Sequence, residues 1–265
     1  MGLGDAIREY TVPSGSVALW WLGQAGFVFK SPGGKTVVVD PYLTNSCMEP
    51  GAQAGFDVDR LVPPPIEPEE LAAFDAYLVT HSHQDHLDPE TLSRYREAGG
   101  RGLYIAPADA CEKLDAWGVP EGERQMTWPN RTHRLGDLEI RTTFAIPFGG
   151  DDLTHVGYLF SIEGGPRIYL TGDTAYEEIL PLSVAPHKPD VLITVINPCF
   201  RNLSPIEAAR LARLLDVKVA IPCHYDMFRS NGLSPQMFHT NLKVEGLGDR
   251  YRELTHGRPF LFPER

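Results

Sequence analysis

Residues 79–88 read VTHSHQDHLD, and this stretch decides how the rest of the chain is interpreted. Within six residues it offers three imidazoles and one carboxylate, on His81, His83, Asp85 and His86. The apolar run at 76–79 predicts a short buried strand, so these side chains fall where a strand ends and a loop begins. Imidazole and carboxylate are ligands of zinc, manganese and iron(II), and no cysteine takes part as it usually does in a structural zinc site. Four ligands from one short loop are also more than a single ion would take from it, so we expect two adjacent ions.

Composition limits the classes of protein that the chain can belong to. Its 265 residues carry a net charge of −11 without any lysine or arginine run, so we expect no nucleic-acid partner. No apolar run approaches 18 residues, so we expect no membrane span. The four cysteines form no C-x-x-C pair and residues 1–10 do not resemble a signal peptide, which favours a cytoplasmic location. The sequence leaves a homo-oligomer open.

The order of the predicted elements indicates the fold class. Strands at 17–30 and 37–40 open the chain as an antiparallel sheet, and residues 44–70, rich in proline, glycine and acids, predict a long ordered loop that forms a rim over the site. Further strands are predicted at 103–105, within 132–148, and at 156–162, 167–170, 191–196 and 217–221. Helices are predicted at 69–74, 89–98, 108–117, 204–215 and 234–245. Strands followed by mixed strands and helices, twice over, favour two packed sheets with helices outside, an αββα sandwich of the α+β class, in a single domain spanning 1–265.

Three more candidate ligands lie next to predicted strands. Asp173 follows the strand at 168–170, His224 follows the strand at 219–221, and His155 precedes the strand at 156–162. Strand ends from distant parts of one fold can meet on one rim. Gly172 would let the Asp173 carboxylate approach closely, and one carboxylate can bridge two ions. Considered alone, Asp173 would be explained more simply as a turn residue and His224 as a buried histidine. Because residues 81–86 already supply a cluster of ligands, we expect these residues to be ligands as well.

Together these motifs resemble those of the metallo-β-lactamase superfamily. The matching features are the loop at 81–86, the Thr-Gly-Asp-Thr turn at 171–174, the late His224, and Asp40 at the end of an early strand. Within that superfamily the chain is most similar to the L-ascorbate-6-phosphate lactonase group. The segments that carry this similarity are WWLG at 20–23 with Gly26, GYLF at 157–160, INP at 196–198 and IPCHYD at 221–226.

The resemblance implies the metallo-β-lactamase fold and a ligand set. The first ion would be held by His81, His83 and an intermediate histidine, the second by Asp85, His86 and His224, and Asp173 would bridge them. The superfamily commonly places the intermediate histidine after the strand matching 141–146, where this chain reads PFGG at 147–150. We assign it to His155, with Asp152 as the alternative ligand and a substrate-contacting rim residue as the alternative role. The remaining histidines, His133, His187, His239 and His256, are predicted to lie on the surface.

The implied cofactors are two divalent ions, zinc or manganese, with iron also accepted by such ligands. A hydroxide shared by the ions would attack a carbonyl carbon, because the pKa of a bound water falls from about 15.7 to about 7. Asp85 and Asp173 are the expected catalytic carboxylates. Asp40 would either support a ligating histidine or cap the turn at 41–42.

The implied substrate is a small lactone, including a sugar lactone phosphate such as L-ascorbate 6-phosphate. Arg201 is the first candidate for phosphate contact, with Asn197 and Tyr176 as further substrate-binding candidates. The lactonases carry a basic residue directly after Asn-Pro, whereas Cys199 and Phe200 stand there in this chain. The alternatives are a phosphodiesterase acting on a small cyclic phosphodiester or a phospholipid and, in third place, a non-hydrolytic iron-binding redox protein.

Overall fold

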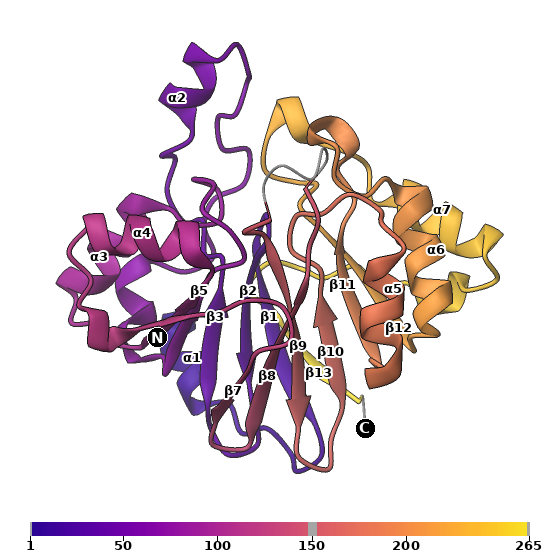
Figure 1. Ribbon diagram of the computed structural model, residues 1–265, viewed down its shortest axis with the longest axis horizontal. Helices are drawn as coiled ribbons and strands as arrows, with labels where there is room; N and C mark the ends of the chain where they lie inside the picture. The colour runs from indigo at the N-terminus through magenta and orange to yellow at the C-terminus, as the bar shows by residue number, and fades with distance from the viewer. Residues whose placement is uncertain (1, 148–152, 264–265) are drawn as a thin grey trace.

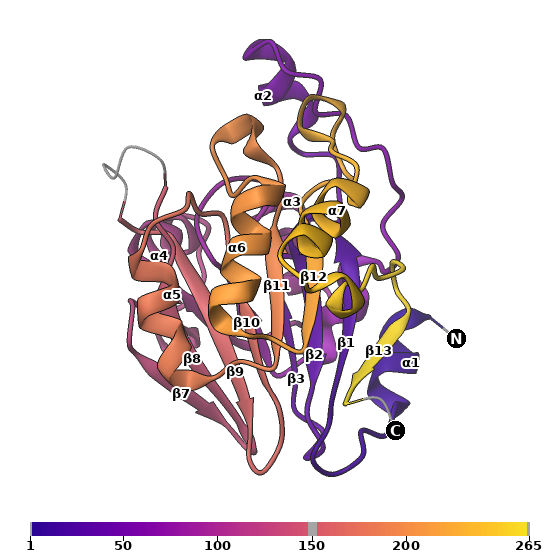
Figure 2. The same ribbon diagram turned by 90° about the vertical axis from the view of Figure 1, so that its right-hand side faces the viewer.

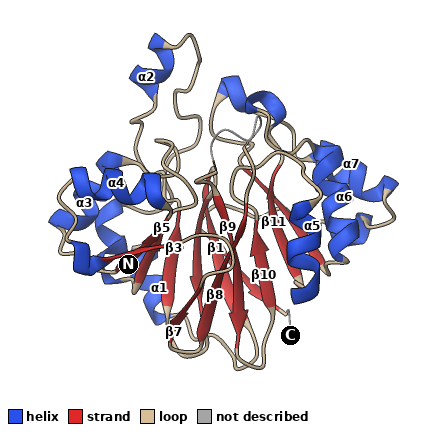
Figure 3. Cartoon of the chain, viewed as in Figure 1, coloured by secondary structure: helices blue, strands red, loops and turns tan. Residues whose placement is uncertain are grey.

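Two β-sheets packed face to face form the centre of the molecule, and helices cover their outer faces (Figure 1, Figure 3). The computed structural model describes residues 2–147 and 153–263. Within them, the first sheet has the spatial order β13 (Pro259–Phe262), β1 (Val17–Gly23), β2 (Gly26–Lys30), β3 (Thr36–Val39), β4 (Ala76–Leu78), β5 (Leu103–Ala106) and β6 (Arg124–Met126). The second sheet has the order β12 (Val219–Cys223), β11 (Val191–Val195), β10 (Arg167–Leu170), β9 (Val156–Ile162), β8 (Leu138–Phe144) and β7 (Thr132–Leu135).

Strand β1 shows why the first sheet must be covered on both faces. All seven of its residues are buried, and successive side chains of a strand point to opposite faces. Leu19 belongs to the apolar cluster between the two sheets, whereas Trp20 belongs to the cluster beneath the outer helices. Phe29 of β2 and Phe160 of β9 stack between the sheets with ring centroids 4.1 Å apart. The core therefore has two layers, one on each side of this sheet.

The helices form the two outermost layers. Apolar residues of α1 (Leu3–Glu9), α3 (Pro89–Glu97) and α4 (Ala108–Ala116) pack on the first sheet. Those of α5 (Ile179–Val184), α6 (Pro205–Leu215) and α7 (Gln236–Val244) pack on the second sheet (Figure 2). Side chains cap two of these helices: Asp88 accepts from the Glu90 amide, and Ser204 forms a capping box with Glu207. The predicted four-layer αββα sandwich is confirmed.

Strand direction brings distant segments to one edge. Strands β3 to β6 run parallel to one another, and so do β10 to β12, so their carboxyl ends point the same way within each sheet. Strand β9 runs antiparallel to β10, so its first residues lie beside the end of β10. The Val156 amide donates to the Thr80 carbonyl at 2.9 Å, which joins the two sheets at this edge. Residues that follow β4, β10 and β12 therefore meet there.

The structure adds elements that sequence reasoning missed. These are α1, α5, β6 and β13, together with α2 (Met48–Gln53) inside the predicted loop at 44–70. Strands β6 and β13 lie at the edges of the first sheet. They have three and four residues, and strands of this length are too short to show a periodic pattern. Helix α2 buries none of its residues and stands clear of the body of the molecule (Figure 1). Among the described residues, no helix combines the length and apolar composition needed to cross a bilayer.

The predicted surface position of His133 is wrong. Its side chain is buried on β7, where Nδ1 lies 2.9 Å from Gln125 Oε1 and Nε2 lies 3.0 Å from Thr127 Oγ1. Sequence reasoning missed this because the short strand β6, which carries Gln125, was not predicted. Burial lowers the pKa of His133 to about 4, so the ring is neutral near pH 7.

Candidate metal centre

The structure brings all seven predicted ligands together at the edge where the parallel strands end. They form three overlapping groups, and within each group one ligand atom per residue lies within 4.8 Å of the others. The groups are His81, His83 and His155; His81, His86 and Asp173; and Asp85, His86 and His224. The alternative ligand Asp152 lies outside the described residues.

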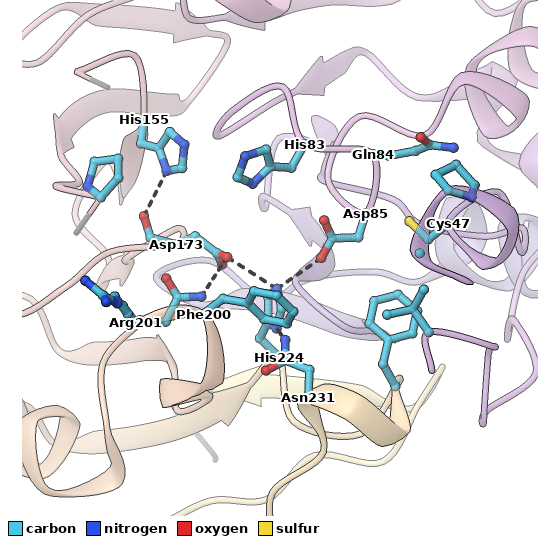
Figure 4. A pocket seen from close by; sticks show the side chains of 16 residues that line it. Cys47, His83, Gln84, Asp85, His155, Asp173, Phe200, Arg201, His224 and Asn231 are labelled. Atoms are coloured by element: carbon cyan, nitrogen blue, oxygen red, sulfur yellow. Dashed lines mark hydrogen bonds and ion pairs between the residues drawn. The ribbon is translucent and has the colours of Figure 1, made fainter. Parts of the chain in front are cut away.

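The first group contains histidine nitrogens that face one another. His81 Nε2 lies 2.9 Å from His83 Nδ1, and the rings of His81 and His155 stack with centroids 4.0 Å apart. The other nitrogen of His81 lies 3.1 Å from Thr80 Oγ1, which fixes the ring orientation. His155 is buried, and its Nδ1 lies 3.3 Å from the Asp173 carbonyl oxygen (Figure 4). This arrangement favours His155 as the intermediate histidine.

The group of Asp85, His86 and His224 has the same character. His86 Nε2 and His224 Nε2 lie 3.2 Å apart, and both rings are buried. Asp85 Oδ2 lies 3.2 Å from His224 Nε2 (Figure 4) and 3.5 Å from His86 Nε2. Two imidazole nitrogens and one carboxylate oxygen are thus directed at a common point.

Asp173 lies between the groups. Its Oδ1 is 3.5 Å from His86 Nε2 and its Oδ2 is 3.5 Å from His224 Nε2, and one of its carboxylate oxygens also lies within 4.8 Å of a His81 nitrogen. Oδ1 is buried and has no hydrogen-bond partner among the described residues. Gly172 has a φ of +62°, and a Cβ there would lie 2.5 Å from the Val156 carbonyl oxygen, so this turn requires glycine. The carboxylate is thereby brought against both groups.

This donor set fits a divalent metal ion. Imidazole nitrogens and carboxylate oxygens are ligands that such ions accept. Here histidine nitrogens lie next to other histidine nitrogens instead of next to ordinary hydrogen-bond partners. No hydrogen-bond donor among the described residues reaches the buried Asp173 Oδ1, and a bound cation would compensate this oxygen. Burial opposes charge on His86, but Asp85, Asp173 and Asp40 outweigh burial and raise the pKa of His86. These three carboxylates therefore favour positive charge at the His86 end of the cluster.

Asp40 contacts the cluster from behind. Its Oδ1 accepts from the Thr80 amide at 2.8 Å, and its Oδ2 accepts from Thr80 Oγ1 at 2.5 Å and lies 2.8 Å from His86 Nδ1. These carboxylate contacts reach across to Thr80 and His86, as expected of a residue that supports a ligating histidine. Complete burial raises the pKa of Asp40, although His86 and Thr80 partly oppose the shift.

Sequence reasoning missed two amide side chains that contact the carboxylates. Gln24 Nε2 donates to Asp85 Oδ2 at 2.8 Å, and Asn202 Nδ2 donates to Asp173 Oδ2 at 2.7 Å. Gln24 occupies the turn between β1 and β2 with a φ of 52°, where its carbonyl accepts from the His224 amide at 3.0 Å. A polar residue between two apolar strands was the available signal for Gln24. No local pattern marks Asn202.

A cavity of about 470 Å³ opens beside the cluster and is lined by five of its ligands together with Arg201. The two other predicted substrate contacts lie outside this lining. Asn197 is buried behind Asn202, whose Nδ2 lies 3.3 Å from Asn197 Oδ1. The ring of Tyr176 lies beneath the guanidinium of Arg210 at 4.9 Å. The geometry gives a substrate-binding role of Asn197 and Tyr176 no support.

Comparison with known proteins agrees with this geometry. Residues 35–225 match the family model of the β-lactamase superfamily domain. A UPF0173 metal-dependent hydrolase of Myxococcus xanthus is 31% identical over 225 residues, covering 81% of this chain and 72% of the relative. A probable L-ascorbate-6-phosphate lactonase of Escherichia fergusonii is 26% identical over 272 residues, covering 88% and 76%.

Solved structures share the fold. An isothiocyanate hydrolase from Delia radicum gut bacteria has a TM-score of 0.76 at 19% identity, and the match covers 92% of this chain and 98% of that one. At this identity the likeness concerns the fold alone. The family match, the relatives and the histidine and aspartate cluster agree with one another, and the chain belongs to the β-lactamase superfamily as a metal-dependent hydrolase related to the L-ascorbate-6-phosphate lactonases.

Proposed function

We propose that this hydrolase opens small lactones with the help of two divalent ions. His81, His83 and His155 would hold the first ion, Asp85, His86 and His224 the second, and Asp173 would be shared. The observation that carries this proposal is the set of three overlapping donor groups, in which the group that contains Asp173 shares His81 with one of the others and His86 with the other. Zinc or manganese suits such ligands, and iron is also accepted.

When bound, such ions supply an acidified water as the nucleophile and a Lewis acid for the carbonyl oxygen. The protein's own part is to hold the ligands in place. Asp40 keeps a proton on His86 Nδ1 and so leaves Nε2 free to ligate. Gln24 and Asn202 each donate to one carboxylate oxygen, which fixes the orientation of Asp85 and Asp173.

The overall reaction consumes one water. Its oxygen forms a new bond to the lactone carbonyl carbon, the ring C–O bond breaks, and the released alkoxide takes up a proton to give a hydroxy acid. The relatives named as probable lactonases support this substrate class. Arg201 lines the cavity and is the proposed contact for an anionic group, including the phosphate of a sugar lactone phosphate such as L-ascorbate 6-phosphate.

A substrate panel tests the proposal. Zinc-loaded and manganese-loaded protein would be assayed with γ-lactones, sugar lactones, L-ascorbate 6-phosphate and bis(p-nitrophenyl) phosphate. We expect lactone hydrolysis that Asp173→Ala abolishes and that Asp115→Ala, at an exposed acid of α4, leaves intact. Hydrolysis of the phosphodiester without any lactone hydrolysis would overturn the proposal in favour of a phosphodiesterase.

A further inference from the structure

One wall of the cavity consists of apolar side chains that the proposed chemistry does not use. Pro50, Val58, Phe200 and Phe228 line it, in the same cavity as the cluster ligands. Phe200 is 46% exposed, which is high for a large aromatic residue, and it lines the same cavity as Asp173 and His224 (Figure 4). Exposed apolar surface that adjoins a reaction centre marks a place where an apolar group binds.

Contacts between distant segments hold this wall in place. Val58 lies on the segment at 45–62, which includes α2, and Asn45 and Asp59 bridge the base of that segment with a 2.7 Å hydrogen bond. The Asp57 amide donates to Ser230 Oγ at 2.6 Å, and the Ser230 amide donates to the Asp57 carbonyl at 2.9 Å, close in sequence to Phe228. The wall is therefore formed before any substrate arrives.

A contact between two aromatic rings joins the segment at 45–62 to Phe200. Phe56, beyond α2, packs edge-on against Phe200 with ring centroids 5.1 Å apart. Phe200 belongs to the 3-10 helix Pro198–Phe200, which follows β11 on the second sheet. The segment carrying α2 thus reaches from the first sheet to the second across the cavity.

The amides that line the cavity already donate within the protein. Gln84 Nε2 donates to the Ser46 carbonyl at 2.7 Å, and Asn202 Nδ2 donates to Asp173. Asn231 Nδ2 lies 3.4 Å from His224 Nδ1. Hydroxyl groups placed against Val58 and Phe200 would lose water without gaining hydrogen-bond partners from these apolar side chains.

We propose that this wall is a subsite for an apolar alkyl substituent of the substrate, so that the preferred lactone carries a hydrocarbon chain rather than sugar hydroxyl groups. This subsite rests on the lactone hydrolysis proposed above. The chain would lie along Val58, Phe200 and Phe228 while the carbonyl reaches the cluster. Full burial of one methylene is worth about a fourfold gain in binding.

The test compares γ-valerolactone with γ-nonalactone, whose side chain is four methylenes longer, and with L-ascorbate 6-phosphate. Four fully buried methylenes would give about 200-fold, and because one side of the cavity is open we expect γ-nonalactone to have a kcat/KM at least tenfold higher. Phe200→Ala and Val58→Thr should each reduce this ratio by about threefold or more. Leu182→Ala, at an exposed residue of α5, is the matched control and should leave the ratio unchanged.

A binding measurement separates failure of the subsite from failure of the proposed function. The hydrolysis products 4-hydroxypentanoate and 4-hydroxynonanoate would be titrated calorimetrically into the metal-loaded protein, whether or not lactones turn over. Tighter binding of 4-hydroxynonanoate by at least tenfold, reduced in Phe200→Ala, supports the subsite. Equal binding of the two acids, or a higher kcat/KM for L-ascorbate 6-phosphate, overturns it. Absence of turnover with every lactone overturns only the proposed reaction.

Discussion

Replacing Asp40 by asparagine tests how the protein prepares a metal ligand. In the wild type, Asp40 Oδ2 lies 2.8 Å from His86 Nδ1 and Oδ1 accepts from the Thr80 amide. In Asp40→Asn, the side-chain oxygen must take the place of Oδ1, because only an oxygen can accept from the Thr80 main-chain amide. Nδ2 then takes the place of Oδ2 and faces His86 as a donor. Nδ1 must then accept, and its proton moves to Nε2, the atom that points at His224. A ligating atom is thereby blocked without any change in side-chain size.

The expected loss follows from this tautomer change. Removing the outer partner of a ligating histidine typically costs 10–100-fold in metal affinity, which corresponds to about 1.4–2.7 kcal/mol. Loss of the charged hydrogen bond should also lower the free energy of unfolding of the metal-free protein by about 1.5–3 kcal/mol. Metal affinity would be measured by competition with a chelator of known affinity, and stability by urea unfolding.

Asp88→Asn is the matched control. Asp88 is equally buried and follows the same loop, but its Oδ2 accepts from the hydroxyls of Thr44 and Thr91 at 2.8 and 2.6 Å. The two hydroxyls can rotate to accept from an amide, but the Thr44 main-chain N–H, which donates to Oδ2 at 3.3 Å, cannot, so we expect a loss of stability with less than about threefold change in metal affinity. Equal metal affinities in wild type and Asp40→Asn would refute the orienting role of Asp40 and leave it a purely structural residue.

Three further predictions concern other parts of the structure. Asn202→Ala removes the 2.7 Å donor to Asp173 Oδ2 and should lower kcat/KM at least about tenfold, whereas an unchanged kcat/KM would show that Asn202 positions nothing. Because burial lowers the pKa of His133 to about 4, the unfolded state binds more protons below pH 6.5, so stability is lost as the pH falls towards 4. Between pH 6.5 and 4.5, the free energy of unfolding of His133→Gln, measured with urea, should fall by about 1–2 kcal/mol less than that of the wild type. Equal decreases in the two proteins would contradict a neutral buried ring. Removing metal with a chelator should lower Tm by about 10 °C relative to protein with free metal 1,000-fold above Kd, and an unchanged Tm would argue against a bound ion.

Much of the fold could be predicted because its inner strands are apolar runs with clear ends. Strands β9 and β10 have the predicted bounds, and β11 ends within one residue of them. Strand β13 could not be predicted, because its pairing with β1 joins residues more than 230 positions apart and no local pattern announces such a contact. Helix α2 escaped prediction because it buries no side chain and therefore has no apolar face.

The candidate site divides in the same way. His81, His83, Asp85 and His86 share one loop, so their proximity is a local property that spacing reveals. Asp173 and His224 could be proposed because each follows an apolar strand, and the parallel direction of β10 to β12 then brings them to one edge. Gln24 and Asn202 act through contacts with Asp85 and Asp173, which lie 61 and 29 positions away in the sequence. Such contacts depend on the packing of whole sheets, so spacing alone does not reveal them.

The most direct measurement is the number of metal ions per chain, determined by mass spectrometry of the purified protein after reconstitution with zinc. Two ions are predicted for the wild type, and at most one for His83→Ala, whose exposed ring can be removed without disturbing the core. Asp173→Ala, which removes the proposed shared ligand, should retain neither ion tightly. Two ions in both variants, together with full hydrolase activity, would contradict the two-ion centre.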